Sequence, residues 1–314
     1  MKGLTIENLN ETLKKSRPNV KESTIKMYAS NLKKLKTLFE ADDFNFLKNM
    51  DKVKDKISHL HYTSQRNYLN SIIVLLQAYE NNDKIQKEYV SFRDTLNKQY
   101  EDENANGVIS DKQKKSFIPL KELNEMIEKM GNDLKGFKKK ELTAKDKMLL
   151  QVYVIYQIHV RLPMRNDLAG AEAIMKRTYN KLSEAEKKAK NYLVVEKSKM
   201  WFVLNKFKTS AKYEELKFDV PKDLEKLLRS YIRINGMGVL FKSSTGKPLS
   251  RNALSQLLIK YSKRYIDKSI STTMLRKIVL SHKFADVNKE KEEMAKITGH
   301  SISTMDKVYI KEKE

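Results

Sequence analysis

A short polar segment divides this chain and thereby limits the folds that are open to it. Residues 101–115 read EDENANGVISDKQKK, which offers little apolar surface to bury and includes Gly107. Such a composition favours a linker over part of a packed core. The chain has 314 residues, so each side of the segment is long enough to bury a core. We therefore predict a domain over residues 1–100, a linker over 101–116 and a second domain over 117–314.

The first part of the chain has the periodicity of amphipathic helices. One run places an apolar residue on the same helix face at every turn, with Ser23 or Thr24 as its cap: Ile25, Tyr28, Leu32, Leu35 and Phe39. A second run extends from Tyr62 to Tyr79, and the residues between the two runs suit shorter helices. We predict a helical bundle for the first hundred residues.

The second part begins and ends with helical patterns and changes period in between. Helices are predicted over 120–130, 145–160, 168–175, 224–234, 254–265, 273–284, 290–297 and 304–309. Short β-prone runs occupy 191–195, 200–204 and 216–220, with a turn over 205–212 between the last two. The predicted fold is therefore mainly α, with one small antiparallel β-sheet in the second domain.

The charge of the chain points to nucleic acid. Lysine and arginine number 63 against 40 acidic residues, which gives a formal charge of +23. This is more than solubility requires, and its sign attracts phosphate. A bias towards lysine on every exposed face is the alternative explanation. Nucleic acid is therefore the first partner to consider, although charge alone does not settle the function.

Several classes of protein are disfavoured. The absence of cysteine excludes disulfides, cysteine-ligated zinc and thiol nucleophiles, and it fits a reducing compartment. The five histidines form no metal-binding pattern, and we place His59 and His61 on the surface. The longest apolar run, 148–160, contains two glutamines and a histidine, so it indicates a buried helix. We expect a soluble, intracellular protein of the cytoplasm or nucleus, with no membrane contact, metal or cofactor.

The most informative motif is ITGHSISTMDKVY, residues 297–309. Gly299 suits the end of a helix, His300 follows in the turn, and Ser303 with Asp306 can cap a helix that carries Tyr309. The motif resembles that of the tyrosine recombinases, in which a Gly-His-Ser turn precedes the nucleophilic tyrosine by the same spacing.

Further residues carry the resemblance in the family's order. The sequence LPMRNDL, residues 162–168, is similar to the first arginine box and gives Arg165. The sequence TTMLRK, residues 272–277, is similar to the second box and gives Arg276. Between them FKTS places Lys208 in the sheet turn, where the family has its β-hairpin lysine. The helical bundle before the linker resembles the family's core-binding domain.

The resemblance implies a reaction and a role for each residue. Arg165 and Arg276 would bind the non-bridging oxygens of a phosphodiester and stabilise the charge of a pentavalent transition state. Tyr309 would attack the phosphorus and form a 3′-phosphotyrosyl intermediate. His300 would donate a hydrogen bond to a non-bridging oxygen, and Lys208 would protonate the leaving 5′ oxygen. Neither ATP nor a divalent metal is needed.

The chain departs from the family pattern around both arginines. Thr273 stands where the family usually has a histidine, and a hydroxyl is a weak base at neutral pH. Asp167 follows Arg165 by two positions instead of three, with Leu168 at the third. Lys277 stands where some relatives have a second histidine. We assign supporting roles to Thr273, Asp167 and Lys277.

Other interpretations remain open at this stage. Each assigned residue could instead have a purely structural role. Lys206 and Lys212 are alternatives to Lys208 as the general acid. A type IB topoisomerase uses similar chemistry as a monomer, and an inactive DNA-binding protein of the same fold is a third possibility.

For a recombinase, the resemblance implies a tetramer on DNA. The sequences of the two arginine boxes and the composition resemble those of recombinases from large DNA viruses or mobile elements. This resemblance favours integration as the outcome. Five residues follow Tyr309, so we expect subunit exchange to use the Tyr309 helix or another surface. We expect this helix to be mobile without DNA.

Overall fold

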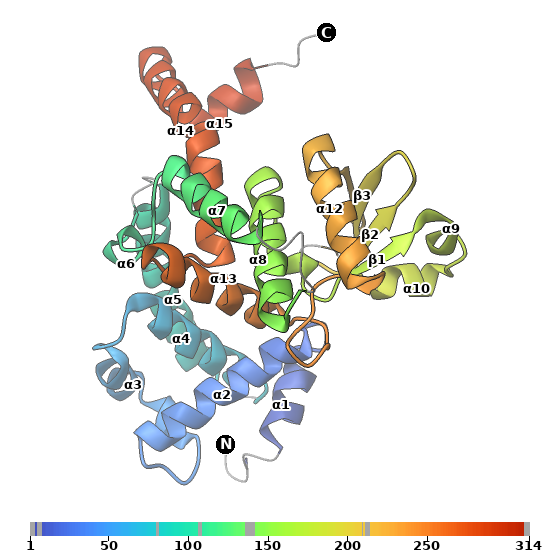
Figure 1. Cartoon of the computed structure of the whole chain (residues 1–314). Coiled ribbons are helices and arrows are strands. Elements are labelled where there is room, and N and C mark those ends of the chain that lie inside the picture. The colour runs from blue at the N-terminus through green and yellow to red at the C-terminus, as the bar shows by residue number, and fades with distance from the viewer. Residues whose placement is uncertain are drawn as a thin grey trace. The chain divides into compact units, whose positions relative to one another are not determined.

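The chain divides into two compact units, Met1–Ile109 and Ser110–Glu314 (Figure 1). The computed structural model describes residues 4, 8–79, 82–105, 109–135, 142–208, 210 and 214–310. The boundary between the units lies within 101–116, the segment predicted as a linker. Part of that segment is helical, because α5, Asp83–Ala105, continues into it and α6, Asp111–Lys114, begins soon after the boundary.

The first unit is a bundle of helices, as its periodicity predicted. It contains α1, Leu9–Ser16; α2, Glu22–Leu38; η1, Asn45–Lys48; α3, Met50–Ile57; α4, Tyr62–Leu76; and α5. Helix α4 packs against α2 and α5, and every residue from Ser71 to Leu76 is buried. Burial on all sides of this second half places it at the centre of the bundle. The predicted cap of α2 is wrong: Lys21 is the N-cap, and Ser23 and Thr24 lie inside the helix.

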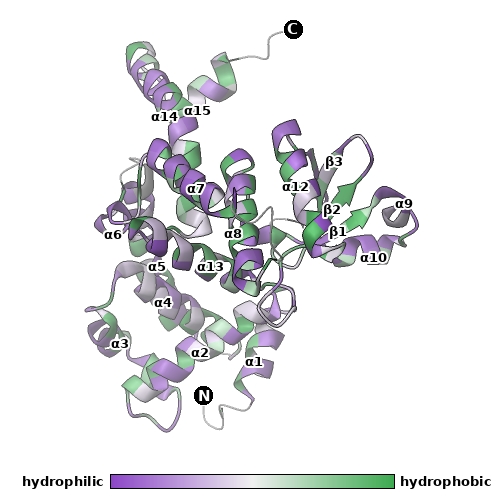
Figure 2. Cartoon of the chain, in the orientation of Figure 1, coloured by the Kyte–Doolittle hydropathy of each residue, from purple (hydrophilic) through white to green (hydrophobic). Residues whose placement is uncertain are grey.

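The second unit is mainly helical around one sheet. Its helices are α6; α7, Leu120–Lys135; α8, Ala144–Arg161; η3, Asn166–Leu168; α9, Lys176–Tyr179; α10, Glu184–Ala189; α12, Lys222–Asn235; α13, Arg251–Ile266; α14, Thr272–Thr298; α15, Ile302–Thr304; and the π-helical turn η4, Met305–Tyr309. Helix α8 packs against α7, α12, α13 and α14. Figure 2 shows hydrophobic residues along α8 and the strands, whereas α10 is hydrophilic. The core of this unit therefore surrounds α8.

The sheet has five strands in the order β4-β3-β2-β1-β5. They are β1, Glu172–Met175; β2, Tyr192–Val195; β3, Met200–Leu204; β4, Leu216–Asp219; and β5, Gly238–Val239. The pairs β2–β3 and β3–β4 are antiparallel, as predicted for these three runs. Strand β1 runs parallel to β2, because α9 and α10 cross over between them, and β5 pairs antiparallel with β1. The sheet is thus mixed, where an antiparallel one was predicted.

The prediction of a helix over 168–175 is wrong. The helical turn η3 ends at Leu168, and Gly170 adopts a φ of 75°. Glycine is the residue that reaches this left-handed conformation at little cost, and it ends the turn. The chain then forms β1, in which buried Ala173 pairs with Leu193. A short apolar run does not distinguish a strand from a helix by periodicity.

Helix α14 is continuous from Thr272 to Thr298, where two helices were predicted. The sequence between these residues contains neither glycine nor proline, so nothing in the backbone chemistry interrupts the helix. It ends at Gly299 as predicted, with a φ of 69°. Ser301 caps α15, whereas Ser303 and Asp306 were the predicted caps. Figure 1 shows the end of α14 and α15 extending away from α13 and the sheet.

Throughout the described ranges, every helix is too short or too polar to cross a membrane.

Candidate active site

Four segments of the second unit meet at one pocket of about 220 Å³. They are η3 after α8, the turn that follows β3, the start of α13 and the start of α14. The pocket is lined by Arg165, Asn166, Asp167, Lys208, Arg251, Thr272, Thr273 and Arg276. We call it the cation pocket, because four of these side chains are positively charged.

Arg165 and Arg276 lie close together in the cation pocket, next to the carboxylate of Asp167. Arg276 is half-buried in the second turn of α14. Burial lowers its pKa most, the charge of Arg165 lowers it further, and Asp167 acts in the opposite direction. Among the described residues, neither guanidinium donates a hydrogen bond to a protein group or forms an ion pair. Two like charges in this setting are stabilised by an anion that enters from solvent.

Asp167 connects the first arginine box to α13. Its carboxylate is buried, with 6% of the residue exposed, and Oδ1 accepts a hydrogen bond of 2.9 Å from Nη2 of Arg251. The same Nη2 donates to the backbone carbonyl of Lys206 at 3.0 Å. Asn166 completes the connection through a bond of 2.9 Å from its Nδ2 to the carbonyl of Arg251. The side chain of Asp167, predicted to orient Arg165, is thus held by Arg251.

The structure separates the lysines of the turn after β3. Phe207 is 3% exposed and packs into the core of the unit, while Lys206 and Lys208 on either side are exposed. Lys208 lines the cation pocket and Lys206 does not. Lys212, the third candidate, lies outside the described residues.

The N-terminus of α14 contributes Thr272 and Thr273 to the pocket. Ser271 caps this helix by accepting a hydrogen bond from the backbone N–H of Met274 at 3.2 Å. The partial positive charge of a helix N-terminus adds to the attraction for an anion. Lys277 lies outside the pocket lining and donates to Oε1 of Gln113 at 2.8 Å, which ties α14 to α6.

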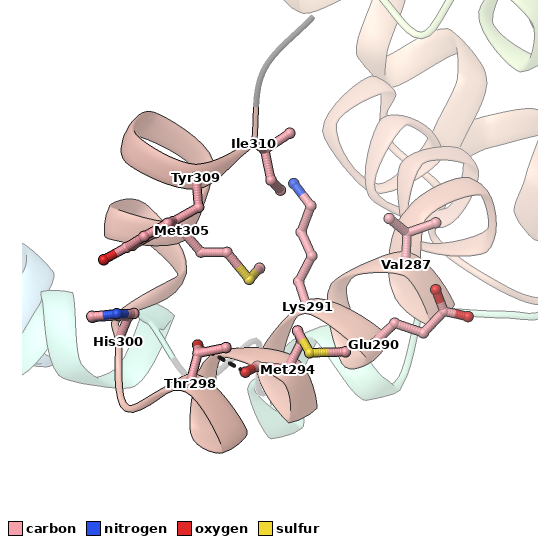
Figure 3. Close-up of a pocket in the computed structure, with 9 residues that line it drawn as sticks. All are labelled: Val287, Glu290, Lys291, Met294, Thr298, His300, Met305, Tyr309 and Ile310. Atoms are coloured by element: carbon pink, nitrogen blue, oxygen red, sulfur yellow. Dashed lines mark hydrogen bonds between the residues drawn. The ribbon is translucent and has the colours of Figure 1, made fainter. Parts of the chain in front are cut away.

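His300 and Tyr309 lie together in a second pocket, of about 560 Å³, between α14 and the C-terminal turns (Figure 3). Their rings are stacked, with centroids 4.8 Å apart and an interplanar angle of 25°. Lys291 of α14 pairs with Asp306 at 2.6 Å and holds the returning chain against the helix. Tyr309 is 59% exposed. The phenol is therefore accessible from solvent and adjacent to an imidazole.

The two pockets are far apart along α14. A helix rises about 1.5 Å per residue, so Arg276 and Lys291 are separated by roughly 22 Å along its axis. Neither His300 nor Tyr309 lines the cation pocket. Of the predicted site residues, the structure brings together Arg165, Asp167, Lys208, Thr273 and Arg276. It holds His300 and Tyr309 as a separate pair.

The sequence reasoning missed Arg251 and Asn166. One signal for Arg251 was available, because a cation in the first turn of a helix opposes the helix dipole. Arg251 follows Ser250, whose side chain caps α13, and so occupies this unfavourable position. No sequence pattern distinguishes Asn166 from other asparagines. In the part of the chain that the structure describes, no three His, Asp or Glu side chains gather as metal ligands would.

The sequence matches no family model and no curated protein. Solved structures that are similar to the chain include two recombinases. The XerH site-specific recombinase, bound to its difH substrate in a pre-cleavage complex, has 15% identity and a TM-score of 0.46, covering 99% of this chain and 86% of that one. The XerA recombinase has 12% identity and a TM-score of 0.34, covering 96% of this chain and 92% of that one. Both similarities are weak.

Proposed function

We propose that this chain is a site-specific DNA recombinase that cleaves and rejoins DNA through a covalent bond to Tyr309. The observation that carries the proposal is the cation pocket, where Arg165, Lys208 and Arg276 converge from distant parts of the sequence. The one carboxylate that lines the pocket among the described residues, that of Asp167, is paired with Arg251. A pocket of this charge and size suits the non-bridging oxygens of one phosphodiester.

The reaction proceeds by exchange of one ester bond for another. Tyr309 Oη loses its proton to water, attacks the phosphorus and forms a P–O bond, while the bond from phosphorus to the 5′ oxygen breaks. Lys208 donates a proton to that 5′ oxygen and recovers it when the strand is rejoined. Because the ester energy is retained, the reaction uses neither ATP nor a divalent metal.

Tyr309 has to approach a cation pocket before it can react. In the free protein it is stacked on His300, well away from Arg276. We propose that DNA binding changes the course of α14 or presents Tyr309 to the pocket of another copy of the chain. His300 would travel with Tyr309, because the turn between them is short, and would then donate to a non-bridging oxygen.

The partner that we propose is double-stranded DNA, bound by a homotetramer. The formal charge of +23 supports an anionic partner. The XerH structure, by its own description, is of a recombinase on its DNA substrate. Integration of a viral or mobile element inside a host cell is the biological setting that we propose.

A covalent trap tests the chemistry. A pool of duplexes with a nick close to a randomised region releases a short strand after cleavage, which prevents rejoining and leaves protein attached to DNA. We expect the wild-type protein to give a complex that survives denaturation, with a chelator present and ATP absent. Tyr309→Phe lacks the nucleophilic oxygen and is expected to give none. Tyr179→Phe, at the end of α9 and outside both pockets, serves as a control that retains the complex.

The other candidate functions make different predictions in the same experiment. An inactive DNA-binding protein would bind the pool without any covalent complex, and this outcome would overturn the proposal. A type IB topoisomerase would form the complex and also relax supercoiled plasmid at high dilution without exchanging strands. An undiminished complex from Tyr309→Phe would exclude Tyr309 as the nucleophile.

A further inference from the structure

A buried asparagine links the two segments that bring Arg165 and Lys208 to the cation pocket. Asn191 precedes β2 and is 5% exposed. Its Nδ2 donates to the backbone carbonyl of Asp167 at 2.6 Å and to that of Lys206 at 3.0 Å. Its Oδ1 accepts from the backbone N–H groups of Asn205 and Lys206, at 2.8 and 2.7 Å. One side-chain amide thus uses both donor hydrogens and both acceptor lone pairs.

Arg251 reinforces this connection from the opposite element. Its Nη2 joins the carboxylate of Asp167 to the carbonyl of Lys206, so both Asn191 and Arg251 bind the main chain of Lys206. The backbone N–H and carbonyl of Lys206 are therefore both fixed. Phe207, buried in the core, anchors the next residue of the turn. Lys208 follows directly, with its backbone attached to a rigid support.

We propose that Asn191 and Arg251 are positioning residues, which clamp the turn after β3 so that Lys208 is held over the bound phosphate. This inference rests on the proposed function and extends it to residues outside the sequence motifs. A lysine side chain is long and flexible, and a fixed backbone reduces the volume that its ammonium group explores. Removal of either side chain leaves the buried polar groups that it bonded without a hydrogen-bond partner. The two residues are therefore expected to depend on each other in holding the turn.

Proton delivery by Lys208 provides a readout that a purely structural defect does not change. A second DNA substrate carries sulfur instead of the bridging 5′ oxygen, and a thiolate leaves readily without protonation. The ratio of the cleavage rate on sulfur to that on oxygen is the measured quantity. Lys208→Ala is expected to raise this ratio on the order of 10²-fold. We expect Asn191→Ala and Arg251→Met to raise it at least about tenfold, because the ammonium group is misplaced.

Gln151→Ala is the matched control. Gln151 is also a buried amide of this unit, and it binds the N–H and carbonyl of Lys242 at 2.8 and 2.9 Å. Its loss is expected to destabilise the unit and to leave the sulfur-to-oxygen ratio unchanged. Arg251→Lys keeps a positive charge with its donor hydrogens on a single nitrogen, and it is expected to raise the ratio less than Arg251→Met does. An unchanged ratio in Asn191→Ala and Arg251→Met, with a raised one in Lys208→Ala, would overturn the positioning role.

Hydrogen exchange tests the clamp without DNA. The amides of Asn205 and Lys206 are expected to exchange slowly in the wild type and at least about tenfold faster in Asn191→Ala, but not in Gln151→Ala. Rapid exchange of both amides in the wild type would overturn the clamp whatever the activity. If the wild type cleaves no DNA, the proposed function fails, and slow exchange would then leave the clamp as a structural feature without this role.

Discussion

At the level of single residues, the cation pocket concentrates charge where folding gains nothing from it. Arg276 loses water on burial and faces Arg165. Arrangements that cost stability and have no structural benefit are typical of functional sites. The motifs predicted Arg165 and Arg276 as site residues from their sequence neighbourhoods, and the structure brings both to one pocket. The clamp residues had no such neighbourhood, since the partners of Asn191 are backbone groups that only the folded chain brings near.

His159 gives a prediction for the pH dependence of stability. It is fully buried, and Nδ1 bonds the carbonyl of Ile155 at 2.8 Å. Burial lowers its pKa to about 4, with Arg276 acting in the same direction. In the unfolded chain a histidine takes up a proton near pH 6.5. The stabilisation is therefore complete above about pH 6.5 and is lost as the pH falls towards 4, by about 3 kcal/mol in all.

The lone tryptophan, Trp201, reports on the folding of the second unit, because it is buried in β3. Urea unfolding followed by its fluorescence at several pH values gives the free energy of unfolding. His159→Phe is expected to remove most of the pH dependence between about 6.5 and 4. His282→Gln, at an exposed position of α14, is the control and is expected to keep it. If the free energy of unfolding changed equally with pH in His159→Phe and in the wild type, His159 would not be the source of the pH dependence.

At the level of elements, the course of α14 decides whether one chain can complete its own site. The rise per residue places Lys291, which lines the same pocket as Tyr309, roughly 22 Å from Arg276 along the helix. If Tyr309 acts on the pocket of its own chain, α14 has to bend or break when DNA binds. We expect the separation between the end of α13 and the end of α14 to shorten by at least about 10 Å on DNA.

Spin labels can measure this change, since the chain contains no cysteine of its own. Lys263→Cys and Lys296→Cys place labels at exposed positions near the ends of α13 and α14. Lys226→Cys in α12 paired with Lys263→Cys is the control, for which no change is expected. A constant distance in a complex that still cleaves DNA would mean that Tyr309 acts on another copy of the chain.

Elements were predictable where one periodicity dominates and ambiguous where a run is short. The strands at 191–195, 200–204 and 216–220 were correctly placed, because β-branched and aromatic residues are concentrated there. Strand β1 was mistaken for a helix, because its four residues adopt the strand conformation through their pairing with β2. The continuity of α14 was missed, because its apolar residues do not follow a single face.

At the level of the whole molecule, each unit has its own hydrophobic core. The main buried cluster of the first unit extends from Leu4 to Leu96, and that of the second from Ile118 to Val279. We expect the units to unfold in separate transitions, of which Trp201 fluorescence reports the second alone. Circular dichroism records both, because both units are helical.

Core substitutions identify the two transitions. Leu32→Ala, at a fully buried position of α2, is expected to destabilise only the transition that Trp201 does not report, by about 3 kcal/mol. Leu258→Ala in α13 is the counterpart. It is expected to lower the free energy of unfolding measured by Trp201 fluorescence by a similar amount. A shift of both transitions by either substitution would show that the units unfold as one.

Separate cores also affect how such a chain can change over generations. A substitution in the interior of the helical bundle alters the stability of that bundle and leaves the packing around α8 intact. The surface of the first unit is therefore free to diversify while the cation pocket, held by Asn191, Phe207 and Arg251 within the second unit, keeps its geometry. Under the function proposed above, lineages that carry this chain can acquire new DNA targets without rebuilding the pocket that binds the phosphate.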